Sequence, residues 1–328
     1  MKKISKKGKF RLSRYPSDEE ARPVLEPRKN IFWESKAVFN PAALRIKNTT
    51  HILYRSLSED NTSYIGYAST RDGIHIYDRL TEPVYVPRED FEMKKISGAN
   101  SGCEDPRLTK IGTTIYMCYT AFDGIGPPRV AITSISEKKF LTHNWRWEKP
   151  IIITPAGLDD KDTCIFPEKT SNGYFFMHRI GENICGDYLK SLDFNTETMR
   201  KCIHVLGPRL NSWDNCKVGI TAPPIKTKYG WLLFYHGVSK NHTTYRVGAV
   251  LLSLKDPAIV LSRTTDPIFE PVEPYEKNGI VNDVVFPCGI TEDHGILYFY
   301  YGGADTVVGV ATIEIDLVLK ALRHGIEP

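Results

Sequence analysis

The stretch Trp231-Leu232-Leu233-Phe234-Tyr235-His236 is followed by Tyr245-Arg246-Val247-Gly248-Ala249, and this pair of segments recurs along the chain. The first segment is aromatic and apolar, and the second is rich in small residues; both are typical of β-strands bounded by turns. The first segment recurs at a spacing of about 57–65 residues, in copies that begin at Ile52, Ile115, Tyr174 and Ile296. The chain therefore contains five copies of one strand-rich unit.

A steady repeat of this size is typical of solenoids and β-propellers. Short strands, frequent turn residues and few helix-length amphipathic segments favour an all-β, five-bladed β-propeller with four antiparallel strands per blade. The third copy, around Asp187-Tyr188-Leu189-Lys190, follows the pattern least well, and a pair of β-sandwiches is the alternative fold. Apolar residues at helical spacing over 313–323 predict a short closing segment at the C-terminus. Residues 31–328 are expected to form the propeller, preceded by an N-terminal tail over residues 1–30.

The composition is that of an ordinary globular protein, with 41% hydrophobic and 25% charged residues among 328. The net charge of +4 is small and no basic face is evident, which argues against nucleic-acid binding. The basic residues from Lys2 to Arg14 form a charge run that predicts a solvated tail. No apolar segment follows this run, and none elsewhere is long enough to cross a bilayer. The sequence therefore predicts a cytoplasmic protein with no membrane partner.

The seven cysteines are scattered, odd in number, and contain no C-x-x-C pair. This pattern predicts neither a disulfide framework nor a zinc site. Several cysteines lie in apolar runs, where a reduced Cys behaves as a small buried hydrophobe. No metal constellation is visible, so we expect no metal and no cofactor.

In a propeller the innermost strand of each blade lines the central channel, so polar residues beside those strands converge although they are distant in sequence. Each repeat has a Pro-containing segment before its aromatic strand and a polar residue after it. The first, second and fifth repeats supply Asn40, Arg55, Asp105 and Asp305. The third and fourth repeats supply Lys169, Arg179, Lys217 and His236. Their common phase in the repeat predicts one shared site.

Cations gathered on one pocket suit an oxyanion such as phosphate. Carboxylates and an amide suit the hydroxyl groups of a sugar. A sugar beside a phosphate is the arrangement that a glycoside phosphorylase needs. Taken alone, Asp105 and Arg107 fit a structural ion pair at the start of a strand equally well, and Arg55 fits an ordinary charge at the rim.

Five segments occur in order between Phe32 and Asp316. They are Val38-Phe39-Asn40-Pro41, Glu104-Asp105-Pro106-Arg107, Phe166-Pro167-Glu168-Lys169, Gly230-Trp231-Leu232-Leu233-Phe234-Tyr235-His236-Gly237 and Tyr301-Gly302-Gly303-Ala304-Asp305-Thr306. None is diagnostic alone, but in this order on a five-fold repeat the chain resembles glycoside hydrolase family 130. That family contains mannoside phosphorylases and related β-mannosidases.

The resemblance implies that residues 31–328 form a catalytic domain in which Asp105 is the catalytic acid, its proton passing through the 3-hydroxyl of mannose. It also implies that Arg107 supports Asp105. The mannose would be held by Asn40, Arg55 and Asp305. The phosphate would be held by Lys169, Arg179, Lys217 and His236, with Tyr245 and Arg246 as weaker candidates. The expected activity is that of a glycosyl-transferring phosphorylase of inverting mechanism: a β-1,2- or β-1,4-linked mannoside and inorganic phosphate give α-mannose 1-phosphate and a shortened acceptor.

Two other functions remain open at this point. An inverting β-mannosidase of the same family needs a second carboxylate to activate water, and Glu168, Glu182 and Asp214 are candidates. A non-catalytic glycan-binding propeller is the other alternative, because a fold alone does not guarantee chemistry. Phosphate is expected as a co-substrate, with a β-mannoside oligosaccharide as the partner. A homo-oligomer is compatible with the resemblance, and the loops at 85–102 and 121–128 are expected to influence acceptor choice.

Overall fold

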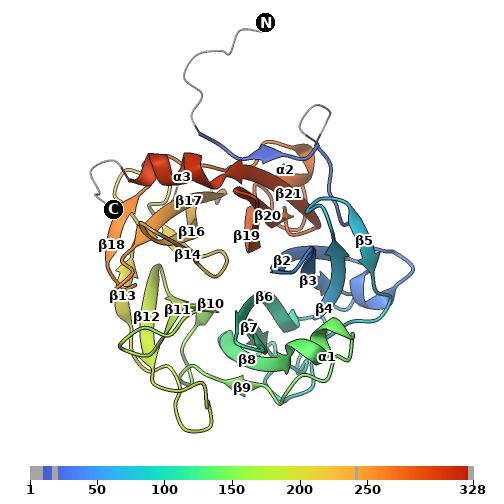
Figure 1. Cartoon of the computed structure of the whole chain (residues 1–328). Helices are drawn as coiled ribbons and strands as arrows, with labels where there is room; N and C mark the ends of the chain where they lie inside the picture. The colour runs from blue at the N-terminus through green and yellow to red at the C-terminus, as the bar shows by residue number, and fades with distance from the viewer. Residues whose placement is uncertain (1–9, 17–20, 241–242, 324–328) are drawn as a thin grey trace, which may run out of the picture.

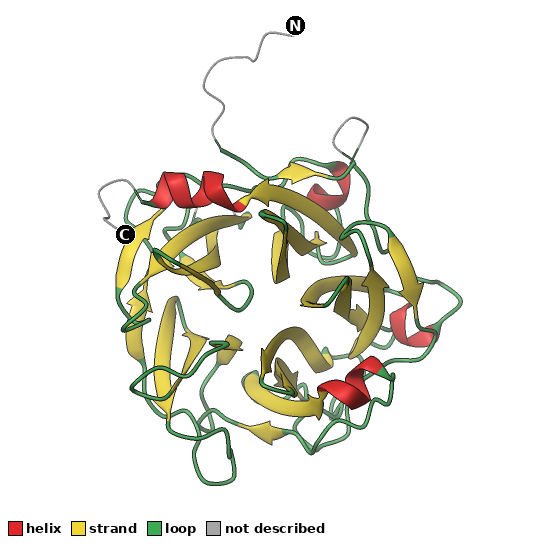
Figure 2. Ribbon diagram, in the orientation of Figure 1, coloured by secondary structure: helices red, strands yellow, loops and turns green. Residues whose placement is uncertain are grey.

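The computed structural model of the chain describes residues 10–16, 21–240 and 243–323. Within these residues the fold is all-β, with twenty-one strands and three short α-helices. Figure 1 shows the sheets arranged around a common centre, with β2, β6, β10, β14 and β19 innermost. The helices lie at the periphery (Figure 2). The all-β prediction is confirmed.

The first eight strands after β1 form one sheet. In order they are β2 (Ala37–Ile46), β3 (Thr49–Leu57), β4 (Thr62–Thr70), β5 (Ile76–Arg79), β6 (Ser101–Ile111), β7 (Thr114–Phe122), β8 (Arg129–Ser136) and β9 (Ile151–Ile152). Neighbours pair antiparallel except β4 and β6, which pair parallel over two residue pairs only. This short contact divides the sheet into two units of four consecutive strands.

Three further sheets follow. One contains β10 (Asp160–Ile165), β11 (Tyr174–Ile180), β12 (Asn183–Leu189) and β13 (Ile203–Leu206). The next contains β14 (Lys217–Ile220), β15 (Ile225–Thr227), β16 (Gly230–Val238), β17 (Tyr245–Leu252) and β18 (Val260–Arg263). The last contains β19 (Val285–Asp293), β20 (Ile296–Gly303), β21 (Val307–Glu314) and, at its outer edge, β1 (Ser13–Arg14).

The paired segments of the sequence repeat are neighbouring antiparallel strands, as predicted: β3–β4, β7–β8, β11–β12, β16–β17 and β20–β21. The small residues have a packing reason. A Cβ on Gly309 would lie 2.4 Å from the Tyr301 ring of the neighbouring strand, so the ring needs glycine there. The pairs Gly66–Tyr54 and Gly248–Tyr235 repeat this contact in other sheets.

The N-terminal segment is attached to the last sheet. Ser13 and Arg14 pair with β21, and Arg14 Nε donates to Glu276 Oε1 at 2.6 Å. Arg11 forms an ion pair with Glu270. These contacts contradict the expectation of a solvated tail for Arg14, whereas Arg11 is exposed. Residues 2–9 lie outside the described residues. The division into a tail (1–30) and a domain (31–328) stays a prediction.

The expected closing helix is confirmed as α3 (Ile315–Leu322), whose buried face packs on the core between the last two sheets. The remaining helical segments are η1 (Phe32–Glu34), α1 (Glu137–Leu141) and α2 (Pro274–Lys277). None of the described helices combines the length and apolar character needed to cross a membrane.

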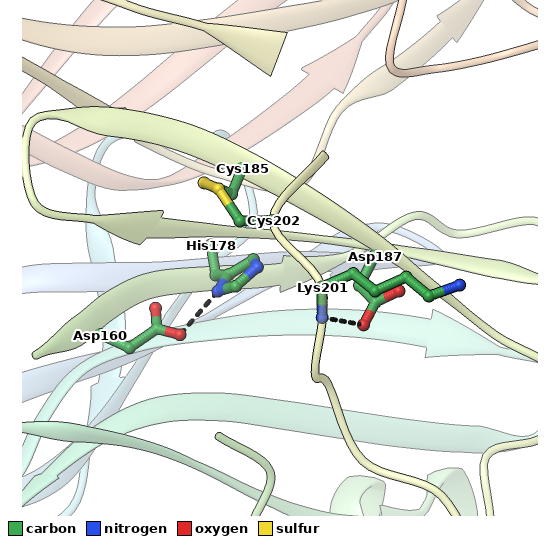
Figure 3. The surroundings of a disulfide bond; sticks show 6 residues. All are labelled: Asp160, His178, Cys185, Asp187, Lys201 and Cys202. Atoms are coloured by element: carbon green, nitrogen blue, oxygen red, sulfur yellow. Dashed lines mark hydrogen bonds and ion pairs between the residues drawn. A yellow bond between two sulfur atoms is a disulfide. The ribbon is translucent and has the colours of Figure 1, made fainter. Parts of the chain in front are cut away.

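One expectation about the cysteines is wrong, because Cys185 and Cys202 form a disulfide (Figure 3). Cys185 lies in β12 and Cys202 directly precedes β13, the antiparallel neighbour of β12, and their Cα atoms lie 4.8 Å apart. Their separation of 17 residues contains no recognisable motif. The other five cysteines are free, and four of them are buried as predicted.

Candidate active site

Three innermost strands carry a polar residue in a β-bulge near their first residues. The ladders of β2, β6 and β10 shift register at β-bulges, and the residues within them are Asn40, Asp105 and Asp162. Their φ angles are 45°, 50° and 57°, in the left-handed region that Asn and Asp tolerate better than other non-glycine residues. Bulges commonly re-aim a side chain beside an active site. Here they place three polar side chains at equivalent positions around the centre.

Seven of the eight predicted site residues line one cavity of about 200 Å³. They come from every unit of the fold, which confirms the prediction that distant polar residues converge. A larger hollow of about 620 Å³ lies elsewhere, beside β8 and β9, but none of its charged residues is buried: Glu89 is half-buried, and Glu148, Lys149 and Asp193 are exposed. The smaller cavity is therefore the candidate active site.

Asp105 is held on one side of this cavity by two donors. Its Oδ1 accepts a hydrogen bond from Asn40 Nδ2 at 2.9 Å and from Arg55 Nη1 at 3.2 Å. Arg55 also donates to Glu104 Oε1 at 2.8 Å. The buried Asn40 Oδ1 accepts no hydrogen bond from the described residues.

Asp305 faces the same side from the connection between β20 and β21, with a φ of 52°. Burial raises the pKa of Asp305 to about 7; Arg55 opposes this shift, and the carboxylates of Asp105 and Glu104 add to it. Three acidic groups around one arginine cannot all ionise without cost. This side of the cavity therefore holds a carboxyl that gains or loses its proton near neutral pH.

The other side of the cavity is built around Asp162. Its Oδ2 accepts from Arg179 Nε at 2.7 Å, and its Oδ1 accepts from Arg107 Nη2 at 3.1 Å. Burial favours the neutral acid, yet Arg179 and Arg107 hold the pKa of Asp162 well below its usual range. His236 Nε2 lies 3.7 Å from Asp162 Oδ2. Gly219 leaves room for both groups, since a Cβ there would lie 2.6 Å from Asp162 Oδ2.

Arg107 connects the two sides from behind. The completely buried guanidinium donates to the Asp105 carbonyl at 3.0 Å and to the carbonyls of Ile220 and Thr221 at 2.7 Å. Arg107 does not line the cavity. This geometry agrees with the supporting role that the resemblance implied.

His236 contributes a neutral ring to the predicted anion site rather than a positive charge. Burial lowers its pKa to about 3, with Arg179 and Lys217 adding to the effect and Asp162 opposing it. The imidazole is therefore neutral near pH 7. Its buried Nδ1 has no hydrogen-bond partner among the described residues. A neutral imidazole offers one donor and one acceptor, so it can orient an oxyanion without adding charge.

Lys217 and Lys161 provide ammonium groups at the cavity. Lys217 Nζ lies 5.0 Å from the centre of the Tyr245 ring, and Lys161 Nζ lies 3.9 Å from Glu104 Oε2. Sequence reasoning missed Lys161 and did not single out Asp162, although Asp162 occupies the position of Asn40 and Asp105 in the repeat. Tyr245, expected only as a weaker candidate, lines the cavity.

The expectation for Lys169 is corrected. Its ammonium donates to the Lys190 carbonyl and lies over the Tyr174 ring, outside the cavity. The segment Phe166-Pro167-Glu168-Lys169 follows the end of β10, whereas Asp162 stands near its beginning. Arg246, the other weaker candidate, also lies outside and forms an ion pair with Glu270.

The three candidate bases for hydrolysis also lie outside the cavity. Glu168 forms an ion pair with Lys226, and Asp214 is buried between Arg209 and Arg263. Glu182 is exposed. The loops at 85–102 and 121–128 contribute no residue to the cavity lining, so their influence on the acceptor stays a prediction.

In a comparison with known proteins, the family model described as beta-1,4-mannooligosaccharide phosphorylase matches residues 15–324 of this chain. Two curated relatives come from Thermoanaerobacter sp. (strain X514). The beta-1,2-mannobiose phosphorylase is 38% identical over 94% of this chain and 99% of its own, and the 1,2-beta-oligomannan phosphorylase is 37% identical over 90% and 95%. The solved beta-1,2-mannobiose phosphorylase of Listeria innocua, in complex with beta-1,2-mannobiose, superposes with a TM-score of 0.77 at 27% identity, covering 95% of this chain and 99% of that one.

Proposed function

The chain belongs to glycoside hydrolase family 130, and from this premise we propose that it is an inverting phosphorylase of β-1,2-linked mannosides. The reaction takes a β-mannoside and inorganic phosphate to α-mannose 1-phosphate and a shortened acceptor. The two curated relatives from Thermoanaerobacter, at 37% and 38% identity over 90% and 94% of this chain, are named for β-1,2 linkages, whereas a 4-O-beta-D-mannosyl-D-glucose phosphorylase that matches 95% of the chain is 34% identical. The higher identity favours the β-1,2 linkage over the β-1,4 linkage in the name of the family model.

The roles follow from the two sides of the cavity. Asn40, Arg55 and Asp305 hold the mannose, and Asp105 supplies the proton for the departing oxygen by way of the 3-hydroxyl of the sugar. As Asp105 loses that proton, the hydrogen bonds from Asn40 and Arg55 stabilise the carboxylate that forms. Phosphate, held by Arg179, Lys217 and His236, attacks the anomeric carbon from the opposite face.

One observation carries the choice of phosphorolysis over hydrolysis. On the anion side the only carboxylate of the described lining is Asp162, and both of its oxygens accept from arginines. A carboxylate with so low a pKa is a poor base for activating water. An inverting hydrolase needs such a base, whereas phosphate already carries the negative charge of a nucleophile and needs cations instead.

We infer in the same way that the fold is a five-bladed propeller. Dividing the eight-stranded sheet at its two-pair contact between β4 and β6 gives two blades, and the other three sheets complete five. The innermost strand of each blade contributes to the candidate site or its neighbourhood (Figure 1).

A cytoplasmic location is also a proposal, and the disulfide gives it a test. Disulfides are rare in reducing compartments. In protein quenched with a thiol-alkylating reagent directly from cells, Cys185 and Cys202 should be alkylated if the chain resides in the cytoplasm, and protected if it resides in an oxidising compartment.

The activity itself is tested by incubating the purified protein with β-1,2-mannobiose, with and without inorganic phosphate, and measuring mannose 1-phosphate and free mannose. We expect mannose 1-phosphate only when phosphate is present, and slower turnover of β-1,4-mannobiose. Release of free mannose at the same rate without phosphate would show a hydrolase.

A further inference from the structure

We infer that Asp162 makes the anion site select an oxyanion that carries a proton, so that it binds phosphate in preference to sulfate. The inference rests on the proposed function, since it concerns the site assigned there to phosphate. Asp162 acts here as a specificity residue, because its carboxylate lines the cavity together with the side chains of Arg179, Lys217 and His236.

The position of the carboxylate is unusual for an anion site. Arg179 and Lys217 attract any oxyanion, and they distinguish poorly between phosphate and sulfate because both are tetrahedral and negatively charged. A carboxylate beside them works against anion binding as such. Its presence in the lining, only 3% exposed, therefore requires a reason beyond charge.

The hydrogen-bonding capacity of the carboxylate supplies that reason. An ionised carboxylate only accepts hydrogen bonds, at about four lone-pair positions on its two oxygens. The two arginines occupy two of these positions, and they keep Asp162 ionised. The lone-pair positions that remain free can only accept a hydrogen bond, so they suit a ligand that carries a donor.

The two anions differ in this respect. Phosphate near neutral pH is a mixture of its mono- and dianion, and each carries at least one P–O–H group that can donate to Asp162. Sulfate at the same pH carries no proton, so one of its oxygens would face the carboxylate with like charges and no hydrogen bond. An unpaired polar contact of this kind is a strong source of discrimination.

His236 does not relieve the conflict for sulfate. Its imidazole is neutral, so it adds no positive charge to offset the carboxylate. Asp162 Oδ2 and His236 both pack against Gly219, where a Cβ would lie 2.6 Å from Asp162 Oδ2 and 2.3 Å from His236 Cε1. The selective contact therefore depends on Asp162 itself.

The test compares the wild type with Asp162→Asn, which keeps the shape but replaces one acceptor oxygen with a donor. Phosphate and sulfate binding are measured by calorimetry, and sulfate is also titrated as an inhibitor competing with phosphate in the phosphorolysis assay. We expect the wild type to bind sulfate at least about tenfold more weakly than phosphate, and the variant to reduce that ratio by at least about tenfold. Glu168→Gln, which alters an exposed carboxylate outside the cavity, should keep the wild-type ratio.

The outcomes separate specificity from support. If Asp162 only positions Arg179, the variant weakens both anions equally and the unchanged ratio overturns the inference. Equal binding of phosphate and sulfate by the wild type also overturns it, and that measurement requires no variant to fold. A failure of the proposed function gives a different result: no mannose 1-phosphate forms, whatever the ratio of the phosphate and sulfate affinities.

Discussion

Replacing Asp105 with Asn is the sharpest test of the catalytic assignment. The amide has nearly the volume of the carboxyl group, and its oxygen can still accept from Asn40 and Arg55, at 2.9 and 3.2 Å in the native site. Sugar binding should therefore change little, while the proton needed by the departing oxygen is lost. A positioned general acid contributes roughly 10²–10⁴-fold. The variant should lose that factor in kcat, or about 3–5 kcal/mol of transition-state stabilisation, with KM nearly unchanged.

The assay uses two substrates that differ in their need for a proton. With β-1,2-mannobiose the full loss is expected. With 2,4-dinitrophenyl β-mannoside, whose phenolate leaves without protonation, the loss should be less than about tenfold. Glu168→Gln is the matched control, because that carboxylate pairs with Lys226 outside the cavity and should leave both rates intact. An equal loss with both substrates would refute the role of Asp105 as an acid and leave it a residue that shapes the site.

Three further predictions concern charge and covalent structure. Asp305→Asn should raise the Tm by a few degrees at pH 8 and not at pH 4: the folded-state pKa of about 7 lies above the ordinary 3.8, so the native carboxyl costs stability as pH rises between these values. Equal Tm values for the variant and the wild type at pH 8, measured by calorimetry, would contradict this. Lys217→Ala should raise the KM for phosphate about 10–100-fold and leave the KM for mannobiose nearly unchanged, whereas Lys169→Ala should change neither KM. Initial rates measured at varied phosphate concentrations check this, and an equal rise in both variants would contradict it. Cys202→Ser should lower the Tm of oxidised protein by several degrees, because its bridge to Cys185 closes a loop of 17 residues. Calorimetry with and without a reductant checks this, and an unchanged Tm would show that the loop is ordered without the bridge.

The repeat in the sequence predicts the strands well because each aromatic strand must pack on a small-residue strand beside it. Tyr301 over Gly309 is one such contact, and it requires both residues in fixed phase. The same phase predicts which side chains meet at the centre. Periodicity alone does not state which end of an innermost strand faces the cavity.

That ambiguity explains the error at Lys169. In the first two units proline follows the bulged residue directly, as in Asn40-Pro41 and Asp105-Pro106. In the third unit the equivalent residue is Asp162, followed by Thr163, and the nearest proline stands past the other end of the strand. Proline therefore identified the wrong end. The pairing of Cys185 with Cys202 could not be predicted for a related reason. Packing decides how neighbouring strands align, and the spacing of cysteines in the sequence contains no information about that alignment.

The outermost strand of the last sheet comes from the beginning of the chain. Ser13 pairs with Thr312 and Arg14 with Ala311, so the first of the described strands finds its partner only when the last of them has been synthesised. Contacts between residues so far apart in sequence slow folding, because a very long loop must close before they form. The nascent chain can assemble the sheets between them in order as they leave the ribosome. The pairing of β1 must therefore wait until β21 has emerged from the ribosome.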